Sequence, residues 1–360
     1  MPSFDIIKEV KPKQTFRVAS VIGKFDLQSE HITEHFKGNI DINENWKIGL
    51  IVGKSGTGKT TIAKQLFEDA YITDFKYSAE TVLDDMPKNC TLEQITNAFN
   101  SVGFSSPPSW LKPYCVLSNG EKMRVDLAKA ILDEKKFFVF DEFTSVVDRN
   151  VAQIGSFAMQ KAIRKSDKKF IAVTCHYDVQ EWLMPDWVFN TDTMTFQSFE
   201  GQKKNRPKIK FEIFQTADKS IWKMFAKHHY LSHSHNNAAN VFIATVNDEI
   251  AGFISILHFP HPKAKNLKKV HRLVILPDYQ GAGIGIILLN EIGKYYKQQK
   301  YRYTIVTSAP SLINALKKSN QWICTRMDRA INKSKSSTIT DFTKNGGYSS
   351  NRITASFELK

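Results

Sequence analysis

The sequence predicts an α/β protein with two domains, and three observations support this prediction. The chain has 360 residues, which exceeds the usual size of one hydrophobic core and suits two domains of average length. In the first half, short apolar segments typical of buried strands alternate with helical patterns, as in a mainly parallel sheet. A polar, basic stretch that contains Gly201 and Pro207 then marks a linker, after which the pattern starts afresh.

The first domain is predicted at residues 1–200, the linker at 201–210 and the second domain at 211–360. The strands expected in the first domain are 48–52, 137–140, 170–174 and 187–190, and its expected helices are 60–69 and 152–165. In the second domain, strands at 240–246 and 249–258 flank the turn-forming pair Asn247-Asp248, which predicts a β-hairpin. A strand at 270–276, a helix at 285–298 and a strand at 303–308 are expected to follow.

The composition is that of an ordinary globular protein, with 42% hydrophobic and 24% charged residues. No apolar run approaches the roughly 18 residues that a membrane helix needs, so no membrane partner is expected. The N-terminus lacks an apolar signal core. The four cysteines are scattered without metal-ligand spacing, which indicates reduced thiols in a cytoplasmic protein.

The charge is concentrated in one half of the chain. Residues 201–360 carry 26 Lys and Arg against 9 Asp and Glu, a net charge of +17, whereas residues 1–200 carry 24 against 27, a net charge of −3. Such an excess favours a polyanionic partner, most simply DNA or another nucleic acid bound through residues 201–360. A lysine-rich solvated surface is the alternative.

A phosphate-binding loop is predicted at residues 53–60, which match the pattern GxxxxGK[ST] without exception. The loop follows an expected strand and precedes an expected helix, so its backbone N–H groups and the helix N-terminus favour phosphate. Lys59 is expected to reach the β- and γ-phosphates of ATP, and the Thr60 hydroxyl to ligate Mg²⁺. The predicted nucleotide-binding residues of this segment are Gly53, Ser55, Gly56, Gly58, Lys59, Thr60 and Thr61.

Two acids follow the apolar run at 137–140 and complete the predicted ATP site. Asp141 ends this run and is expected to hold Mg²⁺ through water. Its neighbour Glu142 is expected to polarise the attacking water. An apolar strand that ends in acids is weak evidence by itself, but an upstream phosphate-binding loop makes the assignment strong.

The first half resembles the ABC ATPase family. The segment Leu117-Ser118-Asn119-Gly120-Glu121 is similar to the family signature LSGGQ, with Asn119 and Glu121 in place of Gly and Gln. Asp148 resembles the D-loop acid, and His176 lies where the family has its switch histidine. The resemblance implies catalytic roles for Glu142, His176 and Lys59. It also implies a homodimer that closes around two nucleotides, with Ser118, Asn119, Gly120, Glu121 and Asp148 at the ATP.

Two further points qualify this resemblance. The interval between Lys59 and Leu117 is short for a transporter cassette, which favours the non-transport ABC ATPases of nucleic-acid maintenance. No glutamine is identified for the family's Q-loop, whose corresponding stretch is 77–86.

In the second half, residues 280–285 match [QR]xxGx[GA] and resemble the acyl-CoA loop of the GNAT N-acetyltransferase family. The match is formed by Gln280, Gly281, Ala282, Gly283, Ile284 and Gly285. The resemblance implies an α+β domain with a mixed, mostly antiparallel sheet and acetyl-CoA or another acyl-CoA as cofactor. Backbone N–H groups of the loop would bind the cofactor pyrophosphate, and the open edge at Leu273 and Ile275 would pair with its pantetheine arm. A plain helix-start turn is the alternative, whereas the glycine spacing excludes a dinucleotide-binding fingerprint.

Acceptor-binding residues are suggested by a histidine-rich run at 227–235. Its side chains could supply acid–base groups in a substrate-facing loop, or the run could be a solvated helix end. With Arg272, the run resembles the bacteriophage Mom-type branch of GNAT-fold proteins, which modifies adenine in DNA. No tyrosine acid is found after the fourth core strand, and Ser308 is a candidate proton donor. The substrate candidates are His229, Tyr230, Ser232, His233, Arg272 and Ser308.

The main functional hypothesis is an ABC ATPase dimer that positions or regulates a GNAT-fold transferase acting on nucleic acid. Two alternatives remain open: an N-acetyltransferase for a small amine or a protein with the ABC half as regulator, or a non-catalytic binding module on an ATPase. Several aromatic side chains either stack on exposed bases or belong to the core. These are Tyr295, Tyr296, Tyr301, Tyr303 and Trp322.

Overall fold

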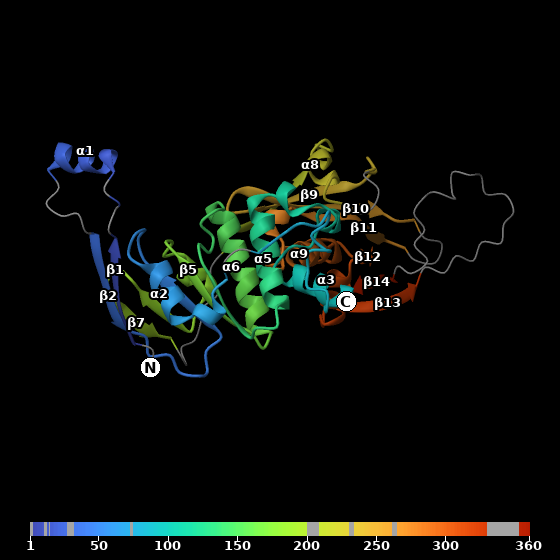
Figure 1. Cartoon of the computed structure of the whole chain (residues 1–360). Coiled ribbons are helices and arrows are strands. Elements are labelled where there is room, and N and C mark those ends of the chain that lie inside the picture. The colour runs from blue at the N-terminus through green and yellow to red at the C-terminus, as the bar shows by residue number, and fades with distance from the viewer. Residues whose placement is uncertain are drawn as a thin grey trace. The chain divides into compact units, whose positions relative to one another are not determined.

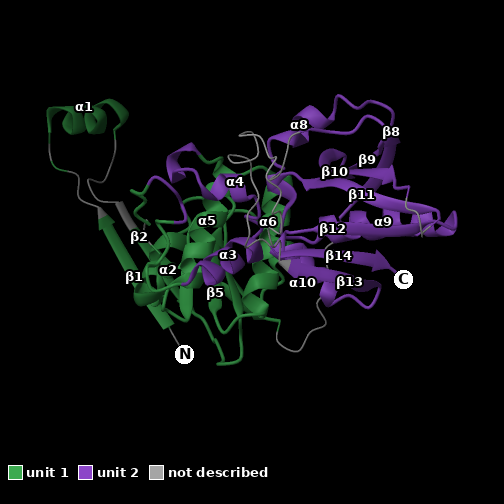
Figure 2. Ribbon diagram, turned by 90° about the vertical axis from the view of Figure 1, so that its right-hand side faces the viewer, with its two compact units in different colours: residues 1–79, 84–90, 117–207 green, residues 80–83, 91–116, 208–360 purple. Residues whose placement is uncertain are grey.

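The computed structural model describes residues 3–10, 13, 15–26, 32–72, 75–199, 209–229, 234–260, 265–329 and 353–360. The chain forms two compact units, coloured separately in Figure 2. Unit 1 comprises residues 1–79, 84–90 and 117–207, and unit 2 comprises 80–83, 91–116 and 208–360. Most of the predicted linker, 201–208, lies outside the described residues. Residues 91–116, which fall within the predicted first domain, group with the second unit.

Unit 1 is built on a five-stranded sheet in the order β4-β5-β3-β6-β7. Strands β5 and β7 of this sheet are labelled in Figure 1. Its strands are β3 (Ile48–Val52), β4 (Phe137–Phe140), β5 (Lys169–Thr174), β6 (Trp187–Asn190) and β7 (Thr195–Ser198). The first four are parallel, and β7 pairs antiparallel to β6. Every residue of β3 is buried, as expected for a central strand covered on both faces. The predicted parallel α/β arrangement is confirmed.

The helices of unit 1 are α2 (Lys59–Leu66), α5 (Asn119–Leu132), α6 (Arg149–Arg164) and α7 (Val179–Leu183), with a 3₁₀ turn η1 (Glu68–Ala70). Helix α2 ends before its predicted limit because Phe67 leaves the helical conformation. Helix α6 begins before its predicted start because Asp148 caps it, accepting a hydrogen bond from the Val151 N–H at 3.0 Å. The core of unit 1 includes Ile62 and Ala63 of α2 packed with sheet residues.

Unit 1 also contains a two-stranded antiparallel ribbon, β1 (Ser3–Val10) and β2 (Ile32–Asn39), with helix α1 (Phe16–Phe25) between them. The ribbon is anchored by Phe4 and Phe36, which are buried in the same hydrophobic cluster as Phe189 of β6. Sequence analysis did not predict these elements.

Unit 2 contains a seven-stranded sheet in the order β13-β14-β12-β11-β10-β9-β8. Its strands are β8 (Phe211–Thr216), β9 (Asn240–Val246), β10 (Glu249–His258), β11 (Leu267–Ile275), β12 (Arg302–Thr307), β13 (Trp322–Arg329) and β14 (Ile353–Leu359). Only β11 and β12 run parallel among these neighbours. The prediction of a mixed, mostly antiparallel sheet is therefore confirmed.

The predicted hairpin is present as β9 and β10. Its two turn residues, Asn247 and Asp248, have φ of 50° and 69°, the geometry of a type I′ turn that matches the twist of the paired strands. The helices of unit 2 are α3 (Leu92–Ser101), α4 (Pro107–Trp110), α8 (Trp222–Ala226), α9 (Ile284–Gln298) and α10 (Pro310–Lys317), with 3₁₀ turns η2 (Tyr114–Val116) and η3 (Pro277–Tyr279).

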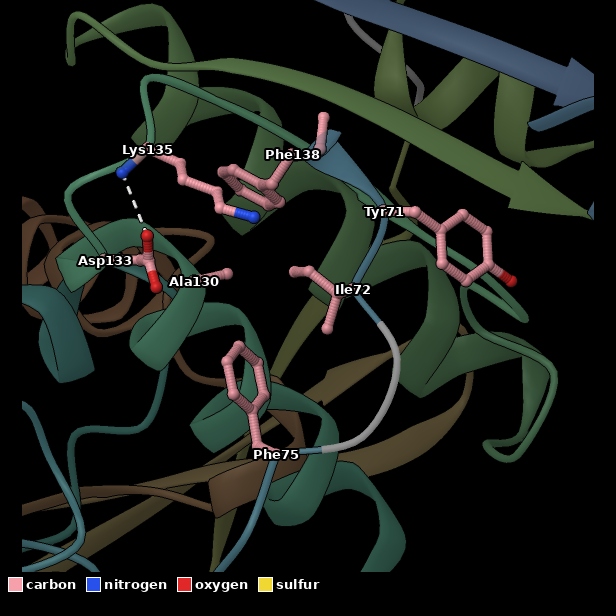
Figure 3. A pocket seen from close by; sticks show the side chains of 8 residues that line it. Tyr71, Ile72, Phe75, Ala130, Asp133, Lys135 and Phe138 are labelled. Atoms are coloured by element: carbon pink, nitrogen blue, oxygen red, sulfur yellow. Dashed lines mark hydrogen bonds between the residues drawn. The ribbon is translucent and has the colours of Figure 1, made fainter. Parts of the chain in front are cut away.

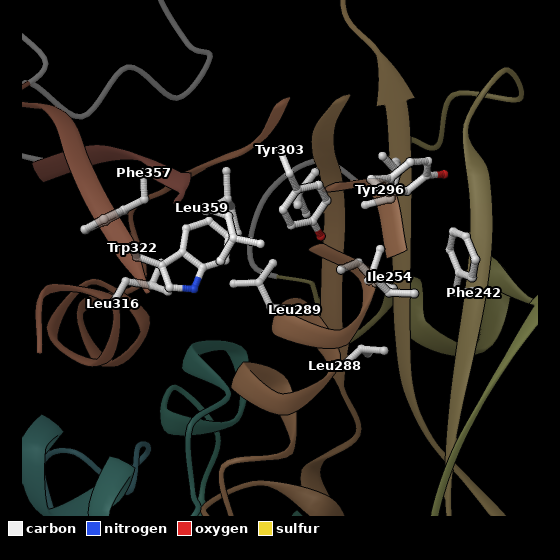
Figure 4. Packing of buried hydrophobic residues seen from close by; sticks show 14 of the residues in the cluster. Phe242, Ile254, Leu288, Leu289, Tyr296, Tyr303, Leu316, Trp322, Phe357 and Leu359 are labelled. Carbon is white, nitrogen blue, oxygen red and sulfur yellow. The ribbon is translucent and has the colours of Figure 1, made fainter. Parts of the chain in front are cut away.

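The core of unit 2 lies between α9, α10 and the sheet (Figure 4). Tyr296, Tyr303 and Trp322 belong to this core, and the Trp322 Nε1–H donates to Asn290 Oδ1 at 2.8 Å. Burial raises the pKa of Tyr303 well above its ordinary value. Base stacking is thus excluded for these three aromatic side chains, whereas Tyr295 is 42% exposed.

None of the helices that the structure describes combines the length and the apolar character that crossing a bilayer requires.

Candidate nucleotide and acyl-CoA sites

The predicted phosphate-binding loop connects β3 to α2. Gly58 caps α2 with a φ of 82°, and a Cβ at this position would lie 2.6 Å from the Phe36 ring, so the site requires glycine. The side chain of Lys59 is buried, and its Nζ donates to the Lys54 carbonyl at 2.7 Å across the loop. The lysine ammonium therefore faces the ring of loop backbone that would surround phosphates.

The loop is braced by residues that follow β6, the neighbour of β3 in the sheet. Thr57 Oγ1 lies 2.6 Å from Thr191 Oγ1, and the Lys54 N–H donates to Asp192 Oδ1 at 2.9 Å. Tyr177 donates its hydroxyl hydrogen to the other Asp192 oxygen, and this bond lowers the pKa of Asp192. Sequence reasoning missed Thr191 and Asp192, whose available signal was a polar pair directly after an apolar strand.

The acid predicted to hold Mg²⁺ lies beside the loop. Thr60 Oγ1 donates to Asp141 Oδ2 at 2.8 Å, and the Tyr71 hydroxyl donates to the same oxygen. Tyr71 is brought there by a parallel bridge to Val139 of β4, and sequence analysis did not identify it.

These oxygen donors fit a magnesium ion. Mg²⁺ in nucleotide sites usually takes one or two carboxylates and completes its shell with phosphates and water. Accordingly, an Asp and a Thr suffice, and no group of three or more His, Cys, Asp or Glu side chains suited to a metal is found in the described ranges.

Glu142 and His176 lie at the ends of neighbouring parallel strands, β4 and β5. Glu142 has a φ of 53°, in the left-handed region. Burial lowers the pKa of His176, the nearby Arg149 lowers it further, and the charge of Glu142 acts in the opposite direction. Arg149 Nη1 lies 3.1 Å from His176 Nδ1, and Arg149 also pairs with Asp178. The lowered pKa keeps His176 neutral at pH 7.

The signature-like segment begins α5. Ser118 is the N-cap: its hydroxyl accepts from the Glu121 N–H at 3.3 Å, while Glu121 Oε2 accepts from the Ser118 N–H at 3.1 Å. This reciprocal capping box gives the acid at 121 a local role, because Glu or Gln can each occupy this position of the motif. Ser118 and Asn119 are exposed, whereas Gly120 and Glu121 are buried.

Unit 1 also contains a cavity of about 160 Å³ (Figure 3). Its lining includes Tyr71, the residue whose hydroxyl donates to Asp141. Ile72, Phe75 and Phe138 give it an apolar wall, and the Lys135 N–H donates to Asp133 Oδ1 at 2.9 Å on its rim. Its lining shares only Tyr71 with the nucleotide residues described above.

The predicted acyl-CoA loop lies between β11 and α9 in unit 2. After the 3₁₀ turn η3, Gly281 and Gly283 have φ of 91° and 89°, and α9 begins at Ile284. The loop therefore leads directly into a helix N-terminus, where unpaired N–H groups and the helix dipole favour anions.

Beside this loop, the two parallel strands separate. Strand β11 pairs with β12 only at Leu267, Lys268 and Lys269, after which β12 pairs with β14 alone among the described residues. The β12-facing edge of β11 from Val270 onward is consequently free of strand pairing, as expected for pantetheine binding. One carbonyl at its end is already used, because Ile275 O accepts from Gln280 Nε2 at 2.8 Å.

The space between the separated strands is a cavity of about 340 Å³. It is lined by His229, Leu257, Phe259, Lys269, Val270, His271, Arg272, Leu273, Ile305, Val306, Thr307, Ala309 and Leu312. Two lysine or arginine side chains and two histidines are in this lining, which includes no Asp or Glu. The electrostatic character of the cavity is therefore basic.

Two predicted acceptor residues, His229 and Arg272, come together in this cavity, and His229 is buried. Ser308 lies between two lining residues but is not one of them. Tyr230, Ser232 and His233 lie outside the described residues.

Sequence analysis did not single out His271, the second imidazole in the lining of this cavity. Burial lowers the pKa of His271 to about 4, with further contributions from Arg272 and His235. Its Nε2 accepts from the Asn236 N–H at 3.2 Å, and the His235 ring centroid lies 5.5 Å away. The neutral ring therefore ties the loop before β9 to β11.

The chain is similar to two kinds of known protein. The Acetyltransferase (GNAT) family model matches residues 176–317, so the chain contains a GNAT acetyltransferase domain; the first residues of this match lie in unit 1. The chain is also 25% identical over 189 residues to the energy-coupling factor transporter ATP-binding protein EcfA1 of Leuconostoc mesenteroides subsp. mesenteroides, a match covering 42% of this chain and 68% of that protein.

Two solved structures are each similar to less than half of the chain. A dimeric, post-hydrolysis ATP-binding cassette, MJ0796 bound to ADP and Pi, is 14% identical with a TM-score of 0.38, covering 47% of this chain and 93% of that chain. A Bacillus subtilis acetyltransferase in complex with CoA is 12% identical with a TM-score of 0.31, covering 42% of this chain and 99% of that chain. The two units each have their own sheet, of five strands in unit 1 and seven in unit 2.

Proposed function

We propose that this protein is an ATP-hydrolysing cassette that controls an acyl-CoA-dependent transferase acting on nucleic acid, with the exocyclic amine of adenine in DNA as the acceptor. The observation that carries the transferase assignment is the separation of β11 from β12 beside a glycine loop at the start of α9. An unpaired strand edge next to an anion-binding helix N-terminus suits a cofactor with an amide-containing arm and a pyrophosphate.

The acyl transfer requires no group beyond acyl-CoA and an amine. The amine nitrogen attacks the thioester carbonyl, the carbon–sulfur bond breaks, CoA leaves as its thiol, and the amine loses one proton. Backbone N–H groups of residues 281–285 would hold the pyrophosphate. His229 supplies an imidazole to the cavity lining and is our candidate for moving that proton, whereas His271 Nε2 already accepts from the Asn236 N–H.

A nucleic-acid acceptor is supported by charge on two scales. Residues 201–360 carry a net charge of +17. The cavity itself presents Lys269 and Arg272 without a carboxylate in its lining, an arrangement that disfavours a cationic amine such as a polyamine or a lysine side chain. A duplex base is out of reach of such a cavity, so the acceptor base would have to be unstacked or single-stranded.

For the ATPase, we assign Lys59 and the loop amides to the phosphates, and Thr60 and Asp141 to Mg²⁺. Glu142 would polarise the attacking water and His176 would sense the γ-phosphate. The exposed side chains of Ser118 and Asn119 support a second role for the signature, contacting ATP on a partner copy in a homodimer. Free cysteines without disulfides are compatible with a cytoplasmic setting.

The test uses the purified full chain with Mg-ATP and radiolabelled acetyl-CoA. Single-stranded DNA, duplex DNA, RNA, spermine and a protein mixture serve as acceptors, and nucleosides are analysed by mass spectrometry. Label is expected in a modified adenine of single-stranded DNA. Lys269→Gln should lower transfer to DNA about tenfold, whereas the exposed Lys223→Gln should leave it unchanged.

Two other outcomes would contradict the proposal. Label found only in spermine or protein would favour the small-amine or protein acetyltransferase. Normal ATP turnover without acetyl-CoA binding would favour a non-catalytic binding module.

A further inference from the structure

Residues 91–116 belong to the same compact unit as the acyl-CoA loop, and one of their turns touches that loop directly. Gly103 has a φ of 85°, and a Cβ on it would lie 2.4 Å from the Gln280 carbonyl oxygen and 3.3 Å from the Gly281 Cα. Backbone therefore packs against backbone here, and only glycine permits this approach.

The side chain of Gln280 joins this turn to the end of β11. Its Oε1 accepts from the Ser105 N–H at 2.8 Å, while its Nε2 donates to the Ile275 carbonyl at 2.8 Å. The side-chain amide of Gln280 thus bonds to two segments: its oxygen to the turn and its nitrogen to the end of β11. Because Gln280 is the first residue of the acyl-CoA loop, the position of the turn at 103–106 sets where that loop begins.

The turn is itself held rigidly. Phe99 and Phe104 are fully buried and meet edge to face with ring centroids 5.1 Å apart. Trp110 packs against Phe99 at 5.7 Å and donates its Nε1–H to the Phe104 carbonyl at 2.8 Å. These contacts tie α3, the turn and α4 into one aromatic cluster, so the turn is expected to move with the cluster as a body.

The cluster is also close along the chain to the ATP signature. After α4, the short turn η2 (Tyr114–Val116) leads directly into Leu117 and the N-cap Ser118. We propose that residues 103–106 are positioning residues of the acyl-CoA site, and that nucleotide binding at the signature changes acyl-CoA affinity through them. This inference rests on the proposed acyl-CoA binding.

Such coupling is reciprocal: if nucleotide changes the affinity for acyl-CoA, acyl-CoA must change the affinity for nucleotide by the same factor. Couplings between sites typically amount to about 5- to 150-fold in affinity. Calorimetry of acetyl-CoA binding to the full chain, without nucleotide, with Mg-ADP and with Mg-ATPγS, is expected to show a difference of at least about fivefold between nucleotide states.

Two variants at the turn contact and one at the nucleotide loop, with one control, assign the difference to the turn. Gly103→Ala should abolish the nucleotide dependence, because its Cβ separates the turn from Gln280, while Gly23→Ala, placed in open space, should retain it. Gln280→Glu keeps an oxygen that accepts from the Ser105 N–H but loses the amide N–H that donates to the Ile275 carbonyl. This variant should weaken acetyl-CoA binding in every nucleotide state. Lys59→Ala should remove the nucleotide effect alone. Circular dichroism verifies that each variant is folded.

The outcomes separate the two proposals. Tight acetyl-CoA binding that is identical in all nucleotide states would overturn the coupling and leave the proposed transferase standing. Full coupling in folded Gly103→Ala would overturn the role of the turn. Absence of acetyl-CoA binding in every state would overturn the transferase and, with it, this inference.

Discussion

The two glycine loops of this protein use the same physics for different purposes. Each precedes a helix whose N-cap is a glycine with positive φ, Gly58 at 82° for α2 and Gly283 at 89° for α9. In the first loop, Lys59 and Thr60 follow at once, with Asp141 in hydrogen-bonding distance. In the second, residues 280–287 carry no ionisable side chain. Both loops can hold phosphates by their backbone, but only the first brings groups that act on the phosphate itself.

The two loops are also held in place by different kinds of contact. The nucleotide loop is held by side chains that follow the neighbouring strand, Thr191 and Asp192. The acyl-CoA loop is held by Gln280 and by the backbone of a turn that lies far away in sequence, at Ser105. A loop fixed by its own sheet suits a constant chemical task, whereas a loop fixed by a remote segment can be adjusted by that segment.

The largest expected effect is that of Glu142→Gln on ATP turnover. Removing a general base should reduce ATP turnover by about 10²- to 10⁴-fold, while ATP binding by the loop persists. Steady-state phosphate release and calorimetry measure the two quantities. The exposed Glu44→Gln serves as the control and should be inert. A loss below tenfold would assign water activation to another group.

A second variant tests the acyl-CoA loop. Gly283→Glu places a carboxylate where the cofactor pyrophosphate is expected and should weaken acetyl-CoA binding about 100-fold by like-charge repulsion. ATP affinity should be unchanged. Because the φ of 89° strains most side chains, Gly283→Gln is the matched control: it has the same size and the same strain as Glu but lacks the charge. Equal losses in both variants would show that backbone strain is responsible, and not charge.

The smallest effect concerns pH. The pKa of His271 is lowered to about 4 in the folded protein, so the unfolded chain binds more protons between about pH 4 and 6.5. The stability from the neutral ring is therefore full above pH 6.5 and is lost as the pH falls toward 4. Protonation would also remove the acceptor for the Asn236 N–H.

Hydrogen exchange measures this effect region by region. Protection of the β11 backbone amides against hydrogen exchange should fall between pH 6.5 and 4.5 in the wild type. It should fall less in His271→Gln. The central strand β3 serves as the internal reference for unit 1. An unchanged pH response of β11 in the variant would refute the assignment to His271.

Much of the architecture was predictable because its signals are local. The turn pair Asn247-Asp248 favours left-handed backbone by its own side chains, and the hairpin follows. The phosphate loop is contiguous, so its glycines and lysine are readable as one pattern. The boundary residues were less predictable: α2 ends at Leu66 and α6 starts at Arg149, because caps compete with the apolar periodicity.

Residues outside the contiguous motifs were not predicted, because the contacts that place them are not local in the sequence. Tyr71 reaches Asp141 because its segment bridges β4, and Asp192 reaches the nucleotide loop because β6 lies next to β3 in the sheet. Neither neighbour relation can be read from spacing along the chain. The same holds for aromatic side chains: Tyr295 and Tyr296 are adjacent in sequence, yet only Tyr296 faces the core.

The sequence by itself determined the backbone conformations of the two loops proposed to bind phosphates, since those depend on glycine and on helix N-termini within one short segment. It also determined the fold class, because burial follows the periodicity of apolar residues. Only the tertiary structure decided which remote groups complete each loop. Strand order placed Tyr71 and Asp192 at the nucleotide site, and folding of residues 91–116 into unit 2 placed Ser105 against Gln280. Those contacts join segments far apart in the chain, and their geometry exists only once the sheets have formed.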